Sequence, residues 1–176
     1  MITDQDILKS SLSHPSLATK LLYEKYADLC YIVSMRYLNN KELAEEMVMN
    51  AFLKAHQNLH NFEKMSSGSL KAWIKKIVIN ECLMQLRKKN IFSDSFEEPA
   101  AFQIDSIAFP NLHYKDIINL INEIPEHLKT VFNLYEIEGY KHNEIAEILS
   151  VSVGTSKSSL SRAKAMLREK LTINGF

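Results

Sequence analysis

The chain has 176 residues, of which 46% are hydrophobic and 24% charged, and its 21 basic and 21 acidic side chains cancel. This composition is typical of a soluble globular protein. No run reaches the roughly 18 apolar residues of a membrane helix, and the N-terminal residues are acidic where a secretory signal is basic, so we expect a cytoplasmic protein without membrane insertion. Cys30 and Cys82 form no C-x-x-C motif, which indicates neither a disulfide framework nor a zinc site.

The charges are unevenly distributed along the chain. Residues 64–90 carry seven basic side chains against Glu81 alone, residues 92–126 carry seven acidic ones against Lys115, and residues 154–170 carry five basic ones against Glu169. Nucleic-acid binding depends on where charge lies rather than on its sum. A net charge of zero therefore does not exclude it.

The few turn-forming residues predict an all-α protein. Only four glycines and four prolines occur, and seven of these eight separate segments of helical period. We expect a first long helix from about Pro15 to Tyr37, ending in the turn Asn39–Asn40. The next helix shows one apolar stripe from Leu43 to Ala55, and after a loop over 60–68 a third helix runs over about 69–89.

The second half predicts a separate helical domain. Residues 91–111 lack a sustained period, include two prolines and several acids, and are interpreted as a flexible acidic linker. Beyond it come an apolar set over 117–124, a helix from Pro125 ended by Gly139, a short helix over 142–149, and a basic helix over 155–171. This order is typical of a helix-turn-helix. The expected domains are thus residues 1–90 and 112–176.

The last helix has one face suited to DNA. At 100° per residue, Val153, Ser156, Ala163, Leu167 and Leu171 fall on the side of Leu160, which predicts the core face. Small hydroxyls and basic side chains on the other sides suit a helix lying in the major groove. The candidate DNA contacts there are Thr155, Lys157, Ser158, Ser161, Arg162 and Lys164, with Ser159 on the same exposed flank. The alternative is a solvated helix of an ordinary bundle.

The third helix mixes basic residues with Trp73. Stacking aromatics beside phosphate-attracting bases suit single-stranded nucleic acid. The alternative is that Trp73 anchors the core and the lysines lie on a solvated face.

Nothing in the sequence favours catalysis or a metal. His56 and His60 are four residues apart but lack a third ligand, Glu45 and Glu46 are adjacent and diverge on a helix, and no nucleophile elbow or phosphate loop occurs. We expect no enzyme activity, no cofactor and no metal.

Both halves resemble the extracytoplasmic function (ECF) group of bacterial RNA polymerase sigma factors. Residues 43–55, LAEEMVMNAFLKA, are similar to the stretch of sigma region 2 that docks on the polymerase, and Lys71-Ala72-Trp73-Ile74, Asn80 and Leu86-Arg87-Lys88 resemble the helix that melts the downstream promoter element. Residues 138–163 resemble region 4, which reads the upstream element. Ser156 stands at a usual valine position of that family.

The resemblance implies a two-domain transcription initiation factor. It implies that Glu45, Glu46, Met49, Asn50 and Leu53 bind the β′ clamp helices of core polymerase. It also implies that Lys71, Trp73, Lys75, Lys76 and Asn80 hold the melted strand, while the loop over 62–70 captures an unstacked base. Further implied partners are the polymerase β flap, promoter DNA and an anti-sigma factor.

Two other function classes stay open. One is a stand-alone helix-turn-helix regulator whose first half dimerises or senses a ligand, which palindromic target DNA would support. The other is a helical adaptor that binds no DNA.

Overall fold

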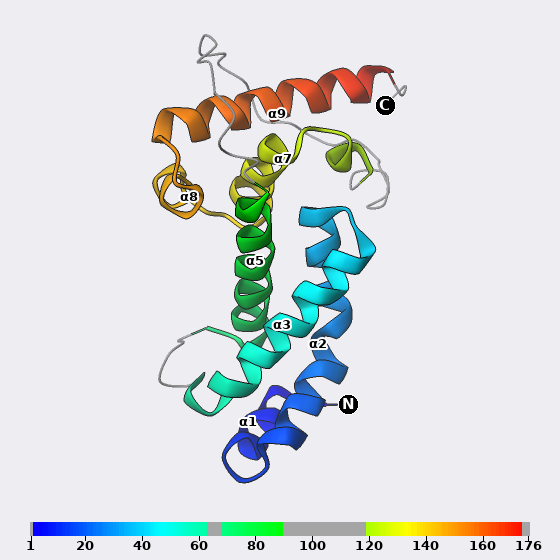
Figure 1. Cartoon of the computed structure of the whole chain (residues 1–176), viewed down its shortest axis with the longest axis vertical. Helices are drawn as coiled ribbons and strands as arrows, with labels where there is room; N and C mark the ends of the chain where they lie inside the picture. Colours follow the sequence, from blue (N-terminus) through cyan, green and yellow to red (C-terminus); the bar gives the residue numbers. More distant parts are fainter. Residues whose placement is uncertain (1, 63–67, 90–118, 174–176) are drawn as a thin grey trace. The chain divides into compact units, whose positions relative to one another are not determined.

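A computed structural model describes residues 2–62, 68–89 and 119–173 (Figure 1). Within these ranges every regular element is a helix, which confirms the all-α prediction. The chain divides into two compact units, Met1–Gln85 and Leu86–Phe176. The predicted linker over 91–111 and the middle of the predicted loop, residues 63–67, lie outside the described residues.

Unit 1 contains the three helices predicted for the first half and one more, α1. Its elements are α1 (Asp4–Ser13), α2 (Pro15–Leu38), α3 (Lys41–Asn58), the 3-10 turn η1 (Leu59–Asn61) and α5 (Leu70–Lys88), whose last three residues belong to unit 2. α2 begins with Pro15, as predicted, and ends at Asn39 in the left-handed conformation with φ 46°. The side chain of Asn40 then accepts the Leu43 N–H at 2.8 Å and caps α3, so the two asparagines form the turn between α2 and α3.

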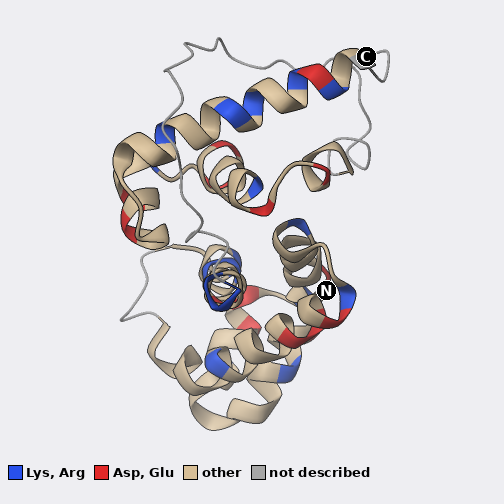
Figure 2. Ribbon diagram, turned by 45° about the horizontal axis from the view of Figure 1, so that its top comes forward, with Lys and Arg blue, Asp and Glu red and all other residues tan. Residues whose placement is uncertain are grey.

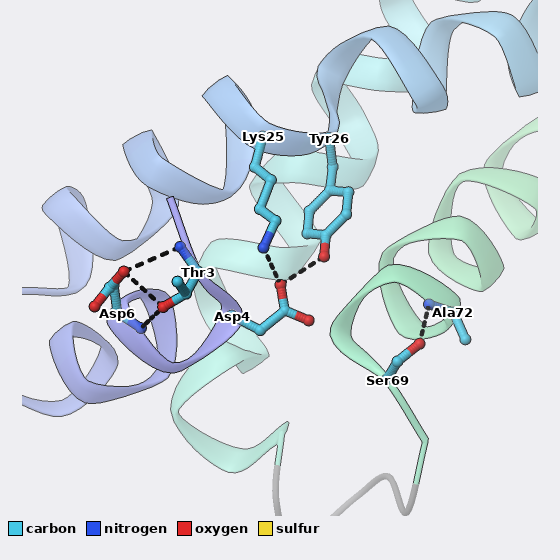
Figure 3. A network of polar contacts seen from close by, with 7 residues as sticks. All are labelled: Thr3, Asp4, Asp6, Lys25, Tyr26, Ser69 and Ala72. Carbon is cyan, nitrogen blue, oxygen red and sulfur yellow. Dashed lines mark hydrogen bonds and ion pairs between the residues drawn. The ribbon is translucent and has the colours of Figure 1, made fainter. Parts of the chain in front are cut away.

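The helix α1 was not predicted from the sequence. It starts with a capping box in which Thr3 Oγ1 accepts the Asp6 N–H at 3.2 Å and the Asp6 carboxylate accepts the Thr3 N–H at 3.0 Å (Figure 3). Asp4 accepts hydrogen bonds from Lys25 Nζ and Tyr26 Oη, both at 2.6 Å. Desolvation raises the pKa of Asp4, but these two hydrogen bonds outweigh it and hold the pKa below its ordinary value. The carboxylate therefore ties α1 to α2.

The core of unit 1 uses small residues where helices approach closely. Ala44, Ala51 and Ala55 of α3 are fully buried, and α2 and α3 pack against each other. Cys30 of α2 and Cys82 of α5 are also fully buried. Burial raises the pKa of both thiols to about 12. Both cysteines are therefore unreactive packing residues.

One ion pair joins α3 to α5. Lys54 Nζ lies 2.6 Å from Glu81 Oε1, and the Lys54 side chain is 47% exposed whereas that of Glu81 is 5% exposed. Glu81 is thus a buried carboxylate whose charge is balanced from α3.

Unit 2 has the helix order predicted for the second half. Residues 119–122 are helical and are followed by α7 (Glu126–Phe132), the segment η2 (Asn133–Ile137), α8 (His142–Leu149) and α9 (Val153–Ile173). α8 has the predicted bounds, whereas α9 extends two residues further at each end. η2 is a π-helix, which was not predicted. Gly139, at φ +78°, follows it and ends the helix as expected.

α9 packs against both α7 and α8. Leu160, Ala163, Leu167 and Leu171 are buried, as the helical wheel predicted. Two positions correct that prediction, because Val153 is 37% exposed and Ser159, placed on the exposed flank, is 1% exposed. Contact with two helices widens the buried arc of α9 towards Ser159, while Val153 lies at the free N-terminal end.

Candidate functional site

The exposed side of α3 brings together four of the five residues predicted to bind polymerase. Glu45, Glu46, Met49 and Leu53 are exposed, and their spacing places them on one stripe of the helix. Met49 is 53% and Leu53 60% exposed, an apolar pair bordered by the two carboxylates. Asn50 is half-buried at the edge. An apolar centre with a charged rim is the arrangement of a protein-binding surface.

The five strand-binding candidates of α5 do not share one stripe. Trp73, Lys76 and Asn80 follow at intervals of three and four residues and form one row, whereas Lys71 and Lys75 form a second row. Lys71, Lys76 and Asn80 are exposed, while Trp73 and Lys75 are half-buried. α5 thus presents its five candidates on two rows rather than on one.

Two further residues extend the row of Trp73, and sequence reasoning did not select them as site residues. Arg87 is exposed and lies seven positions after Asn80, so it falls on the same stripe, as does the exposed Met84. The spacing alone could have identified both. The row therefore runs along most of α5 and ends in a guanidinium.

Trp73 packs against the core and keeps part of its surface accessible. Its ring meets that of the buried Phe62 edge to face, with 5.4 Å between the centroids and an interplanar angle of 68°. The indole is half-buried, so part of its surface is accessible. Trp73 packs against the residue that begins the predicted base-capturing loop and can also present a ring edge to a ligand.

The N-terminal turn of α9 is built from hydroxyl groups. Ser152 Oγ accepts the Thr155 N–H at 2.9 Å and lies 2.8 Å from Thr155 Oγ1, while Ser158 Oγ donates to the Thr155 carbonyl at 3.1 Å. The bond to Ser152 Oγ satisfies an N–H group that the start of a helix leaves unpaired, while the Ser158 hydroxyl adds a second bond to a carbonyl of the first turn. They fix the backbone on which the candidate DNA contacts lie.

The candidate DNA contacts of α9 occupy two adjacent rows. Thr155, Ser158 and Arg162 face away from Leu160, with Arg162 exposed and the other two half-buried. Lys157, Ser161 and Lys164 lie on the neighbouring flank. Blue bands along α9 in Figure 2 mark its lysines and arginines. Both rows together provide donors and charge of one sign.

Lys164 is held in an ion pair with another element of unit 2. Its Nζ lies 2.7 Å from Glu136 Oε1 of η2, and its side chain is only 15% exposed. A phosphate contact by Lys164 would require exchange of this partner. Arg162 instead lies near His127 of α7, where burial and then the charge of Arg162 lower the pKa of the imidazole. His127 is therefore neutral at pH 7.

Other features of the described residues bear on the remaining expectations. No three of their His, Cys, Asp and Glu side chains gather closely enough to hold a metal ion. His56, one of the two histidines at i and i+4, has its Nδ1 2.7 Å from Thr19 Oγ1. None of the helices in the described ranges has the length and apolarity needed to span a membrane.

Known sequence families account for both units. The model of Sigma-70 region 2 matches residues 22–91, and that of Sigma-70 region 4 matches residues 114–167. The chain belongs to the ECF group of RNA polymerase sigma factors. It is a transcription initiation factor, and factors of this family are regulatory rather than catalytic. The matched segments contain every candidate site residue, while α1 lies before them.

Individual relatives agree over nearly the full length. The ECF RNA polymerase sigma-E factor of Haemophilus influenzae is 24% identical over 97% of this chain and 96% of its own. The RNA polymerase sigma-H factor of Pseudomonas aeruginosa is 25% identical over 96% and 93%.

Two solved structures share the fold. The sigma factor RpoE of Bartonella quintana, in complex with the anti-sigma factor NepR, has a TM-score of 0.54 at 22% identity, over 88% of this chain and 97% of its own. CnrH, in complex with the cytosolic domain of CnrY, has a TM-score of 0.53 at 16% identity, over 98% and 99%.

Proposed function

We propose that this sigma factor directs core RNA polymerase to its promoters by reading the upstream element with α9 and by opening DNA at the downstream element with α5. The observation that carries the proposal is the row of Thr155, Ser158 and Arg162, which ends in the exposed Arg162 and lies on a helix whose opposite side is core. In this arrangement Arg162 can donate two hydrogen bonds to guanine in the major groove. Ser158 and Thr155 reach phosphates or base edges.

Unit 1 would supply the other two activities. The stripe of Glu45, Glu46, Met49 and Leu53, with Asn50 at its edge, docks on the β′ clamp helices through its apolar pair, and its carboxylates meet basic groups of the polymerase. The row of Trp73, Lys76 and Asn80, extended by Arg87, holds the separated strand by stacking and phosphate attraction. Lys71 and Lys75 contact backbone phosphates from the second row.

The remaining partners follow from the relatives. Two fold neighbours are complexes with an anti-sigma factor or with the cytosolic domain of a partner protein. We infer a protein inhibitor of the same kind here, a contact of region 4 with the β flap, and action in the cytoplasm. The domain boundary falls near residue 90, ahead of the linker over 91–111.

Substitution of Arg162 tests the reading of the upstream element. Arg162→Ala should weaken use of a duplex promoter, selected beforehand with the wild-type holoenzyme, by about fivefold to 150-fold, because one good base contact contributes about 1 to 3 kcal/mol. Binding to core polymerase should not change. Lys20→Ala, which removes an exposed positive charge from α2, is the matched control. Equal loss of polymerase and promoter binding in Arg162→Ala would contradict the assignment.

Charge reversal tests the docking surface. The double variant Glu45→Lys, Glu46→Lys should bind core polymerase at least tenfold more weakly while its melting temperature stays close to that of the wild type, because exposed substitutions usually change stability by less than about 0.5 kcal/mol. Glu24→Lys, Asp28→Lys reverses two exposed charges of α2 and is the control. Wild-type affinity in the α3 variant would move the docking site elsewhere.

A further inference from the structure

His142 lies where three elements of unit 2 meet. It is the first residue of α8, and its ring stacks on that of Tyr135 in η2, with 4.4 Å between the centroids and an interplanar angle of 25°. Its Nδ1 lies 2.9 Å from Ser156 Oγ in α9. One imidazole thus contacts the segment before the helix-turn-helix and the helix that follows the turn.

Ser156 is a buried residue that lies between candidate DNA contacts in the sequence. It is 0% exposed, and its chain neighbours Thr155 and Lys157, with Ser158 one step on, are the first candidates of α9. A buried hydroxyl needs a hydrogen-bond partner, and His142 supplies it. The backbone N–H of Ser156 donates to the Ser152 carbonyl at 3.0 Å. Both the backbone and the side chain at this position are therefore held.

We propose that His142 is a positioning residue for DNA recognition, which it serves by fixing the rotation of the N-terminal turn of α9 through Ser156. This inference rests on the proposed reading of the upstream element by α9. Successive residues of a helix lie 100° apart, so a small rotation at Ser156 turns Thr155, Ser158 and Arg162 together away from their base edges. A contact made from the core side thereby sets the direction of side chains on the opposite side.

The surroundings of His142 suit this role. Burial, followed by the charges of Lys157 and Lys164, lowers the pKa of its imidazole, so the ring is neutral at pH 7. A neutral ring can accept the Ser156 hydroxyl proton at Nδ1, or donate to the hydroxyl in the other tautomer. Stacking on Tyr135 restricts rotation of the ring. The ring is accordingly held in one orientation towards Ser156.

Two substitutions at position 142 separate the hydrogen bond from the stacking. His142→Phe keeps a ring against Tyr135 but cannot bind the hydroxyl, whereas His142→Asn loses the ring but keeps a polar atom close to the place of Nδ1. The assay reconstitutes each full-length variant with core polymerase. The first DNA probe is a duplex that the wild-type holoenzyme selects from randomised DNA, and the second is the same duplex with one base pair of its upstream element changed. The assay measures the affinity of each holoenzyme for both probes, and the ratio of the two affinities is the discrimination.

Discrimination between these two duplexes should fall about fivefold in His142→Phe, because one hydrogen bond is lost. In His142→Asn it should stay within about twofold of the wild-type value. His14→Phe, an exposed position in unit 1, is the control and should leave it unchanged. Core polymerase affinity should not change in any variant. A His142→Phe protein that binds both duplexes more weakly by the same factor would overturn the proposal, because the residue would then act on stability alone.

The variant Ser156→Ala keeps the test decisive if His142→Phe folds poorly, and a cycle of the two substitutions applies where both fold. Ser156→Ala should cause the same loss of discrimination, and the double variant should be no worse than either single one, because both remove the same bond. Additive losses would overturn the proposal. Failure of the proposed function looks different, since Arg162→Ala would then also leave discrimination unchanged.

Discussion

The ion pair between Lys54 and Glu81 provides a quantitative test of how unit 1 is held together. Lys54→Met removes the ammonium that lies 2.6 Å from the buried Glu81 carboxylate. Loss of one partner from a buried pair costs about 3 to 5 kcal/mol, and loss from an exposed pair about 0 to 1 kcal/mol. The Lys54 side chain is 47% exposed, so water screens the pair, and we expect an intermediate loss of about 2 kcal/mol.

The assay uses the single tryptophan of the chain. Trp73 lies in unit 1, so urea or thermal unfolding followed by its fluorescence reports on that unit in the full-length protein. A loss of about 2 kcal/mol corresponds to a melting temperature roughly 10 °C lower for a domain of this size. Lys41→Met is the matched control, because Lys41 and Glu45 lie 3.9 Å apart with both side chains more than half exposed. It should cost less than about 0.5 kcal/mol.

A second substitution decides whether the buried charge causes the loss. Adding Glu81→Gln to Lys54→Met should recover most of the lost stability, because no uncompensated charge then remains in the core. The reasoning fails if Lys54→Met costs no more than Lys41→Met. It fails equally if the double variant is as unstable as Lys54→Met.

Three further predictions concern unit 1. The folded-state pKa of Asp4 is lowered, so its contribution to stability is complete above its ordinary value of 3.8 and is lost as the pH falls through the folded value. The stability difference between wild type and Asp4→Asn should therefore be constant above about pH 4 and shrink below it, as urea titrations at each pH would show. Cys30 and Cys82 are buried and have thiol pKa values of about 12, so they should resist a thiol reagent in native buffer and react at once in urea. Rapid labelling of the native protein would contradict their burial. Leu53→Asp should reduce core polymerase affinity at least tenfold, whereas the same change at the more exposed Leu12 should not, measured by co-sedimentation; equal effects would argue against a localised docking surface.

The sequence predicted most helices because their signals are local. Pro15 starts α2, the two asparagines after Leu38 end it and cap α3, and Gly139 separates η2 from α8. α1 was missed although its signal was present, since Thr3 and Asp6 have the spacing of a capping box. The π-helix η2 had no such signal, because its register is decided by packing and not by residue type.

The sequence predicted which residues belong to the candidate site more fully than it predicted how these residues are arranged. The stripe on α3 follows from helical spacing and was identified from the family motif. The separation of Lys71 and Lys75 from Trp73 on α5 could have been computed from the same spacing. The burial of Ser159 could not, because it depends on α7 and α8 packing against α9 from two directions. The bond between His142 and Ser156 also joins residues whose proximity only the tertiary structure shows.

The π-helix η2 marks a place where this chain can lose one residue. The bond from the Glu138 N–H to the Asn133 carbonyl, 3.0 Å, spans five residues, so this turn holds one residue more than an α-helical turn. Deleting Ile137 would convert it to an α-turn and leave Gly139 and the start of α8 near their present places. The same deletion within α9 would rotate all later residues by about 100°. This chain should therefore tolerate the loss of one residue better within η2 than within α9.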